Sequence, residues 1–375
     1  MISFEKVAGL VVLALLLRWG YGVVYSIFFS PLRNIPGPFL LQLIPFYDRL
    51  VLIAGKLPWL EHKYHAQFGP VYRKGWNMVQ VVSEEALREI YSTHAYRKSD
   101  VYLFFQGDVQ TIFNTIDRDF HRRRKRIMAP AFTTKEIEAL HPVILSQGVQ
   151  VLVSVLEKNV NQCVNMHTLF GCFALDMIGV LGFGQSFNTL TNGPHIVETW
   201  YRKQLIRMFF NILIPGLKRV YNPYSERLHA FTQEAVDRVR EHDTPSIMAS
   251  LIKAFDPETG DKLSDQEINA EALLQIFAGS DSTASVMTWS LYHILQHPRV
   301  YEKIVGELTA HKQDTSPSLE AAIKETMRVM PPIAGSLERV VPSGGRTIDG
   351  YFLPGGVISF CLQLLTFRLW LASTP

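Results

Sequence analysis

A long apolar stretch near the N-terminus constrains this chain more than any other feature. Residues 7–29 (VAGLVVLALLLRWGYGVVYSIFF) contain one charge, Arg18. About 20 apolar residues in a helix cross a bilayer core, and a charge at its centre costs on the order of 3 kcal/mol, less if it snorkels. A cleaved signal peptide and an interfacial helix are alternatives, but no small-residue cleavage site follows the stretch. We predict one N-terminal transmembrane helix within residues 1–30.

A proline-rich segment separates this stretch from the body of the chain. Pro31 and the sequence IPGP at 35–38 favour a stiff, extended hinge, because proline fixes φ and removes a backbone donor. The hydrophobic share of 47% excludes wholesale disorder, and 37 basic against 34 acidic residues do not favour a polyanion as partner. Three cysteines without a CxxC pair indicate neither a disulfide framework nor a zinc site.

The remaining patterns predict a mainly α fold with small β-sheets. Ser264 and Glu267 have the spacing of a capping box that opens a long helix, and Pro298 suits the first turn of the next one. The dipeptide Asp349-Gly350 is a strong hairpin-turn signal. We expect strands at 71–74, 79–82, 347–348 and 351–353, mostly helix between 84 and 330, and a last helix from about 319 to the prolines at 331–332.

The long helix contains the sequence AGSDST at 278–283. Glycine within a helix costs about 1 kcal/mol relative to alanine, so its presence needs a reason. Two tiny side chains would form a flat patch beside the Ser282 hydroxyl, where a planar cofactor and a small ligand could approach the backbone. Asp281 and Ser282 would then form an acid–alcohol pair for proton delivery. A tight helix–helix crossing at small residues is the alternative.

The following helix contains Glu325 and Arg328, an i,i+3 pair. Such a pair is ordinary, and Glu85 with Arg88 has the same spacing. Its context distinguishes it, because the helix is ended by prolines and followed by Arg339 in the sequence LERVVP and then by the hairpin.

A basic run stands in the sequence FHRRRKRIMAPAF at 120–132. It could be a solvated face, a localisation signal or a nucleic-acid patch. No aromatic residue interleaves the basic residues, so base stacking has no platform there. The helix could instead hold the carboxylates of an acidic cofactor or meet an acidic redox partner.

In this order along residues 31–359, together with DMIGVLGFG at 176–184, these features resemble the cytochrome P-450 superfamily and its microsomal, fungal-like members. The resemblance implies a cytochrome P-450 fold and a haem b cofactor. It also implies NADPH-cytochrome P-450 reductase as electron donor and insertion of one oxygen atom from O₂ into a lipophilic small molecule of fungal secondary metabolism. The chain would be a single-pass protein of the endoplasmic reticulum membrane with a cytosolic catalytic domain and no nucleic-acid partner.

The resemblance also assigns roles to residues. Asp281 and Ser282 would relay protons during oxygen activation with support from Thr283, and Glu325 with Arg328 would form a structural pair. The haem propionates would be held by His121, Lys125 and Arg339. Three positions depart from the usual residues: His121 replaces tryptophan, Lys125 replaces arginine and loses its bidentate fork, and Ser282 replaces threonine.

The last expectation concerns residues 360–375, FCLQLLTFRLWLASTP, which match nothing in the family pattern. Cys361 lacks the glycine- and arginine-containing surroundings of the family's haem-ligand cysteine, so we do not expect it to bind the iron. We therefore expect an anchor at 1–30, a cytochrome P-450 domain without its haem-ligand segment at 31–359, and an unrelated tail. The competing hypothesis is a non-catalytic, truncated remnant unable to form a haem–thiolate centre.

Overall fold

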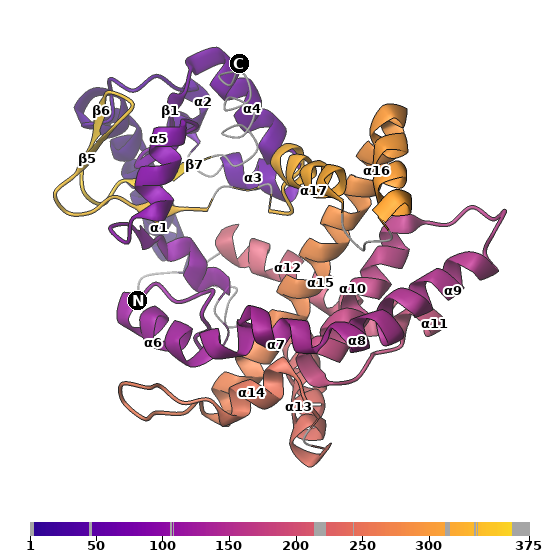
Figure 1. The fold of residues 1–375 in the computed structure, drawn as a ribbon. Helices are drawn as coiled ribbons and strands as arrows, with labels where there is room; N and C mark the ends of the chain where they lie inside the picture. Colours follow the sequence, from indigo (N-terminus) through magenta and orange to yellow (C-terminus); the bar gives the residue numbers. More distant parts are fainter. Residues whose placement is uncertain are drawn as a thin grey trace. The chain divides into compact units, whose positions relative to one another are not determined.

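The computed structural model divides into two compact units, and each is described by itself (Figure 1). Unit 1 comprises Met1–Ser99 with Ala334–Pro375, and unit 2 comprises Asp100–Ile333. The residues that the structure describes are 4–44, 47–105, 107, 109–213, 223–242, 244–311, 316–333, 335 and 337–361.

Unit 1 is built on a five-stranded mixed sheet in the order β1-β2-β7-β4-β3. β1 and β2 pair antiparallel, as the patterns at 71–74 and 79–82 predict, and β7 lies parallel to β2 with Val81 opposite Cys361. The sheet therefore continues two residues beyond 359. The expected tail beyond Cys361, residues 362–375, lies outside the described residues. The strands are β1 (Val71–Gly75), β2 (Met78–Val81), β3 (Arg97–Lys98), β4 (Arg339–Val340) and β7 (Ile358–Cys361).

The predicted hairpin is confirmed as a two-stranded sheet of β5 (Arg346–Ile348) and β6 (Tyr351–Leu353). Asp349 and Gly350 have φ angles of +48° and +82°. Two successive positive φ angles are what the turn type I′ requires, which is why this dipeptide signals a hairpin.

One long N-terminal helix and several short helices complete unit 1. The apolar N-terminal stretch forms α1 and continues into the π-helical turn η1. An 18-residue window of it, Val12–Phe29, is long and apolar enough to span a membrane, and only 6% of that window is buried. The helical elements are α1 (Phe4–Val24), η1 (Tyr25–Phe29), α2 (Phe39–Leu43), α3 (Tyr47–Ile53), α4 (Leu57–Phe68), α5 (Glu84–Leu87) and η2 (Arg88–Ser92).

The described part of unit 2 is almost wholly helical (Figure 1). Its elements are η3 (Asp100–Phe105), α6 (Arg118–Met128), η4 (Ala129–Phe132), α7 (Thr134–Ala139), α8 (His141–Ile144), η5 (Leu145–Val149), α9 (Gln150–Lys158), α10 (Met166–Phe183), α11 (Thr189–Asn192), α12 (Ile196–Leu213), α13 (Pro223–His242), α14 (Ile247–Lys253), α15 (Asp265–Gln296), α16 (Pro298–His311) and α17 (Pro317–Val329).

The central helix of unit 2 is α15, and its start is specified locally. The capping box is confirmed: Ser264 Oγ accepts a hydrogen bond from the Glu267 amide at 3.3 Å, and Glu267 Oε2 accepts one from the Ser264 amide at 2.8 Å. α15 packs most extensively on α10. α10 is itself apolar and long enough to span a membrane, but 67% of its length is buried in the unit, so it serves as a core helix.

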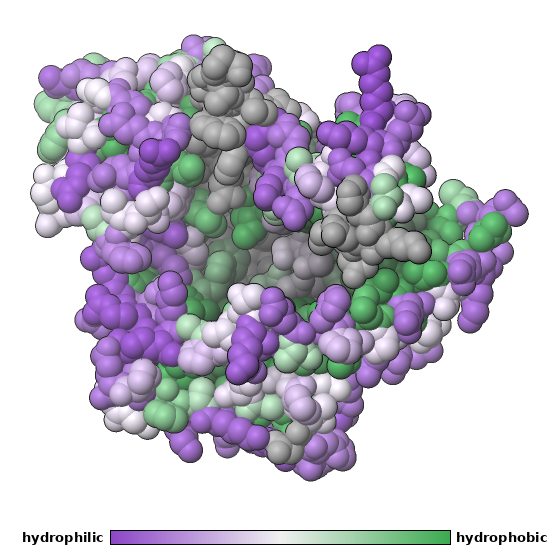
Figure 2. Space-filling model, in the orientation of Figure 1, coloured by the Kyte–Doolittle hydropathy of each residue, from purple (hydrophilic) through white to green (hydrophobic). Residues whose placement is uncertain are grey.

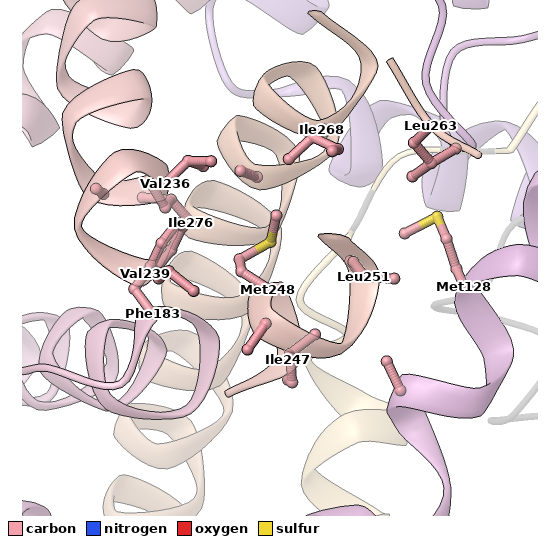
Figure 3. Packing of buried hydrophobic residues seen from close by; sticks show 14 of the residues in the cluster. Met128, Phe183, Val236, Val239, Ile247, Met248, Leu251, Leu263, Ile268 and Ile276 are labelled. Atoms are coloured by element: carbon pink, nitrogen blue, oxygen red, sulfur yellow. The ribbon is translucent and has the colours of Figure 1, made fainter. Parts of the chain in front are cut away.

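The main core of unit 2 lies where α13, α14 and α15 meet α6 and α10 (Figure 3). The apolar face of α15 supplies Ile268 and Ile276, which are at most 3% exposed. Figure 3 shows them among Met128 of α6, Phe183 of α10, Val236 and Val239 of α13, and Met248 and Leu251 of α14. This core holds α6 and α15 in one body, so the two helices that carry most of the predicted site residues are positioned together.

Candidate active site

Ser282 has a defined hydroxyl orientation on α15. Its O–H donates to the carbonyl oxygen of Ala278, one turn earlier, at 2.6 Å. Because the hydroxyl proton is taken up by the Ala278 carbonyl, the Ser282 oxygen can still accept a hydrogen bond from a donor outside the helix. Ala278 is exposed and Ser282 is half-buried, so the small patch that they form is accessible in unit 2.

Gly279 has a different role from its neighbours. A Cβ atom at this position would lie 2.3 Å from Cδ1 of Ile178 on α10. The glycine therefore permits the close crossing of α10 and α15, as the helix-packing alternative predicts. That alternative explains Gly279 only, because Ala278 and Ser282 remain accessible.

Asp281 is exposed on α15 and acts electrostatically on α12. Burial, together with the Asp281 charge, raises the pKa of Tyr201 to about 12. Burial also raises the pKa of Glu198, with a smaller contribution from Asp281. The Tyr201 ring stacks on that of Phe277, one turn before Asp281, with centroids 3.7 Å apart. Asp281 therefore has one acidic neighbour, Glu198, and a buried phenol, Tyr201, that sequence reasoning missed.

No sequence signal links α12 to the motif at 278–283, since the contact joins distant parts of the chain. The Ser282 hydroxyl donates to Ala278 and not to Asp281, so a proton path between Asp281 and Ser282 would need a bridging water. Thr283 is exposed on the same helix.

The basic run forms most of α6, and its four arginines have carboxylate partners within unit 2. Asp117 caps the helix by accepting from the amides of Asp119 and Phe120. Figure 2 shows the surface over α6 as strongly hydrophilic. The pairs are Arg122 with Asp119 at 3.0 Å, Arg123 with Asp261 at 3.1 Å, Arg124 with Glu267 at 2.5 Å and Arg126 with Asp256 at 2.8 Å. The run is thus largely neutralised, which weighs against a nucleic-acid patch.

Arg124 is the buried member of this run, with 1% of its surface exposed. It lies 3.6 Å from Glu271, which is fully buried and also accepts a hydrogen bond from the Ile112 amide at 2.8 Å. Burial opposes ionisation of Glu267, yet hydrogen bonds from Ser264 and the charge of Arg124 hold its pKa below the ordinary value. Arg124 therefore joins α6 to α15, and its Nη1 is buried without a hydrogen-bond partner among the described residues.

His121 and Lys125 lie one turn apart on α6, which places them on the same face. His121 is half-buried and Lys125 is exposed. Within the described part of the chain, no carboxylate pairs with Lys125, unlike the four arginines beside it. The two predicted propionate donors of α6 are thus brought together, and Lys125 has its charge available for a carboxylate.

Arg339 is the third predicted propionate donor, and it belongs to unit 1 on β4. It is half-buried, its guanidinium lies 5.2 Å from the centre of the Tyr91 ring, and its Nη1 donates to the Glu338 carbonyl at 2.9 Å. The stacking on Tyr91 orients this guanidinium, as a planar cation over an aromatic face does.

Glu325 and Arg328 form the predicted pair on α17, where Arg328 Nε donates to Glu325 Oε2 at 2.6 Å. These hydrogen bonds lower the pKa of Glu325 and raise that of Arg328. Nη1 of Arg328 is buried and has no hydrogen-bond partner among the described residues. Arg328 therefore has a donor left for one more acceptor, and the structural role of the pair stays a prediction.

The described cysteine side chains do not suggest an iron ligand. Cys163 is exposed and unpaired, and Cys172 is buried in α10, where burial raises the pKa of its thiol. Cys361 ends β7, but its side chain lies outside the description, so the expectation about it stays a prediction. Within the described ranges no three His, Cys, Asp or Glu side chains gather as a metal site.

The residues present have the chemistry that suits a haem, whose carboxylates need donors and whose ring needs small side chains beside it. Lys125 with His121 offers donors for a carboxylate, and the patch of Ala278 and Ser282 offers small side chains beside a hydroxyl.

Comparison with known proteins decides the family, because the model of the family described as cytochrome P-450 matches residues 36–365. The chain belongs to the cytochrome P-450 family. By family it is a haem-dependent monooxygenase, an oxidoreductase. The match extends beyond the boundary of 359 that the motifs suggest.

Three similar proteins are fungal cytochrome P-450 monooxygenases. This chain is 27% identical to helB3 of Aspergillus fumigatus, over 91% of this chain and 73% of the relative. It is 26% identical to helB1 of the same fungus, over 90% of this chain and 64% of the relative. It is 28% identical to LUC2 of a Fusarium species, over 88% of this chain and 70% of the relative.

Proposed function

We propose that this chain inserts one oxygen atom from O₂ into a lipophilic small molecule of fungal secondary metabolism. The observation that carries the proposal is the Ser282 hydroxyl, which donates to Ala278 and leaves its oxygen free beside an exposed small patch on α15. Fungal monooxygenase relatives support the same reaction class.

Haem, when bound, supplies the oxidation chemistry, and the protein supplies position and protons. Lys125 and His121 would donate to a haem propionate, and by the family resemblance Arg339 would be a further propionate donor. The Ser282 oxygen accepts a hydrogen bond from a water molecule and holds it at the patch. Asp281 exchanges protons with solvent and passes them to that water, while Thr283 adds a second hydroxyl nearby.

A membrane anchor and an electron donor belong to the same proposal. The apolar window Val12–Phe29 supports an anchor in the endoplasmic reticulum membrane with the catalytic domain in the cytosol. NADPH-cytochrome P-450 reductase is the proposed electron donor. If residues 1–30 are the anchor, deleting them removes the protein from the carbonate-resistant membrane fraction. Release of the full chain by carbonate would refute the spanning claim.

The proton role is tested by Ser282→Ala in this chain joined to a haem-ligand cysteine segment, called the extended chain. The variant should consume NADPH at a similar rate while forming peroxide in place of product, because substrate binding rests on apolar contacts. Ser280→Ala is the matched control, since Ser280 also donates to the carbonyl one turn earlier, at 2.6 Å from Ile276. Equal coupling of oxidation to NADPH use in the two variants would favour a packing role for Ser282.

A further inference from the structure

We infer that a polar socket in unit 1 binds the N-terminal helix at Gly22 and Ser26. The lipid-embedded segment then ends near Tyr21 and not at Phe29. The socket consists of Gln42, Arg73 and Trp76. This inference rests on the proposed membrane anchor and states which residues of the apolar stretch belong to the protein and which to the bilayer.

Arg73 is the centre of the socket. Arg73 is 4% exposed, and burial lowers the pKa of its guanidinium. Its Nη1 donates to the Ser26 carbonyl at 2.7 Å and its Nη2 to Ser26 Oγ at 2.9 Å. The remaining bonds go to the carbonyls of Gly75, at 3.0 Å, and Trp76, at 2.9 Å. A buried cation with these four bonds loses half of them if Ser26 leaves.

Ser26 is therefore a protein-facing residue within the apolar stretch. It is 1% exposed, and its hydroxyl donates to Gln42 Oε1 at 2.8 Å. The backbone carbonyl of Gln42 in turn accepts from the Trp76 indole at 2.7 Å. The turn at Ser26 is thus connected to both α2 and the β1–β2 turn.

Gly22 shows that the fit is steric as well as polar. A Cβ atom at this position would lie 2.0 Å from Cη2 of the Trp76 ring, so only glycine admits the ring. Three residues earlier, the Trp19 indole donates to the Leu43 carbonyl at 2.8 Å. A Cβ atom added at Gly20, by contrast, would have no other atom within 4 Å.

The position of Arg18 gives an independent reason for the same boundary. Arg18 is the middle residue of the stretch 7–29, so a span of that whole stretch would put its charge at the bilayer centre. If residues from Gly22 onward belong to the protein, Arg18 lies one turn from the boundary and reaches the headgroups. Trp19 and Tyr21 then fall at the interface, where such rings are favoured.

The shortened segment can span a bilayer that thins slightly around it. Its apolar part, residues 7–21, extends about 22 Å at the helical rise per residue, and local thinning of the bilayer with snorkelling of Glu5 and Lys6 accommodates the few ångströms missing from the endoplasmic reticulum hydrocarbon thickness. Leu10, Leu13 and Leu17 are more than half exposed in unit 1, as lipid-facing residues are.

The test is a depth profile of the full chain in phosphatidylcholine vesicles. A fluorescent amino acid is placed singly at Leu10, Leu13, Leu17, Tyr21 or Tyr25, and its quenching by lipids that carry a nitroxide at known depths is measured. We expect the deepest site at Leu13 and no deep quenching at Tyr25. A deepest site at Leu17, with Tyr25 inside the hydrocarbon, would overturn the socket. Absence of deep quenching at every position would instead overturn the membrane anchor itself.

A pair of glycine variants separates the socket from the anchor. Gly22→Leu makes the stretch more apolar, so it should keep the chain in the membrane while excluding the Trp76 ring. We expect the deepest site to move from Leu13 toward Leu17 in this variant and to stay at Leu13 in Gly20→Leu. Identical profiles for the two variants would contradict the socket, because only position 22 meets Trp76.

Discussion

Replacing Arg124 by methionine tests whether the basic helix is a structural element or a ligand-binding one. The change removes the guanidinium that lies 2.5 Å from Glu267 and 3.6 Å from Glu271. Glu271 is fully buried, so its carboxylate would lose this cation inside the core while keeping the hydrogen bond from the Ile112 amide. Removing one partner of a buried ion pair costs about 3–5 kcal/mol, a large share of a typical ~5–15 kcal/mol of stability.

The assay is urea unfolding of the full chain in detergent, followed by far-UV circular dichroism. Lys125→Met is the matched control, because Lys125 is the exposed neighbour on the same helix and its loss should change stability by less than about 0.5 kcal/mol. Adding Glu271→Gln to Arg124→Met should restore much of the loss, since an amide keeps an acceptor for Ile112 without a charge. Equal stabilities for the two methionine variants would refute the assignment of Arg124 to the core.

Two pH effects follow from buried titratable groups. Hydrogen bonds from Arg126 lower the pKa of Asp256 from 3.8 to about 2. The stability that this carboxylate contributes is therefore present above pH 3.8 and is lost as the pH falls toward 2. In Asp256→Asn the urea midpoint of unfolding should depend less on pH between 3.8 and 2. Burial lowers the pKa of His65 from 6.5 to about 4 although its Nδ1 donates to the Gly69 carbonyl at 3.0 Å. The unfolded chain therefore takes up this proton first, and stability should fall from pH 6.5 to 4 in the parent chain but less in His65→Gln. An unchanged slope in either variant would show that its group is not the one that titrates.

Local signals in the sequence predicted the elements that depend on local chemistry. The Ser264–Glu267 box and the Asp349-Gly350 turn are confirmed because a few adjacent residues satisfy their own backbone groups or set their own φ angles. Glu325 and Arg328 form their hydrogen bond for the same reason, since their spacing places both side chains on one helix face.

Long-range contacts could not be predicted in this way. Nothing in the run HRRRKR distinguishes the buried Arg124 from the exposed Lys125, because that difference depends on where α15 places Glu267 and Glu271. The proximity of Glu198 to Asp281 and the socket around Ser26 likewise join residues that are far apart in the sequence.

The most direct test of the central claim is the reduced carbon monoxide difference spectrum of the extended chain. The account predicts a thiolate-type Soret band that weakens in Lys125→Glu and is unchanged in Lys135→Glu, an exposed lysine on α7. In the unextended chain, a band that disappears in Cys361→Ala would make Cys361 the ligand. No Soret band in the extended chain, or equal bands in the two glutamate variants, would contradict the proposal that α6 and α15 hold the haem.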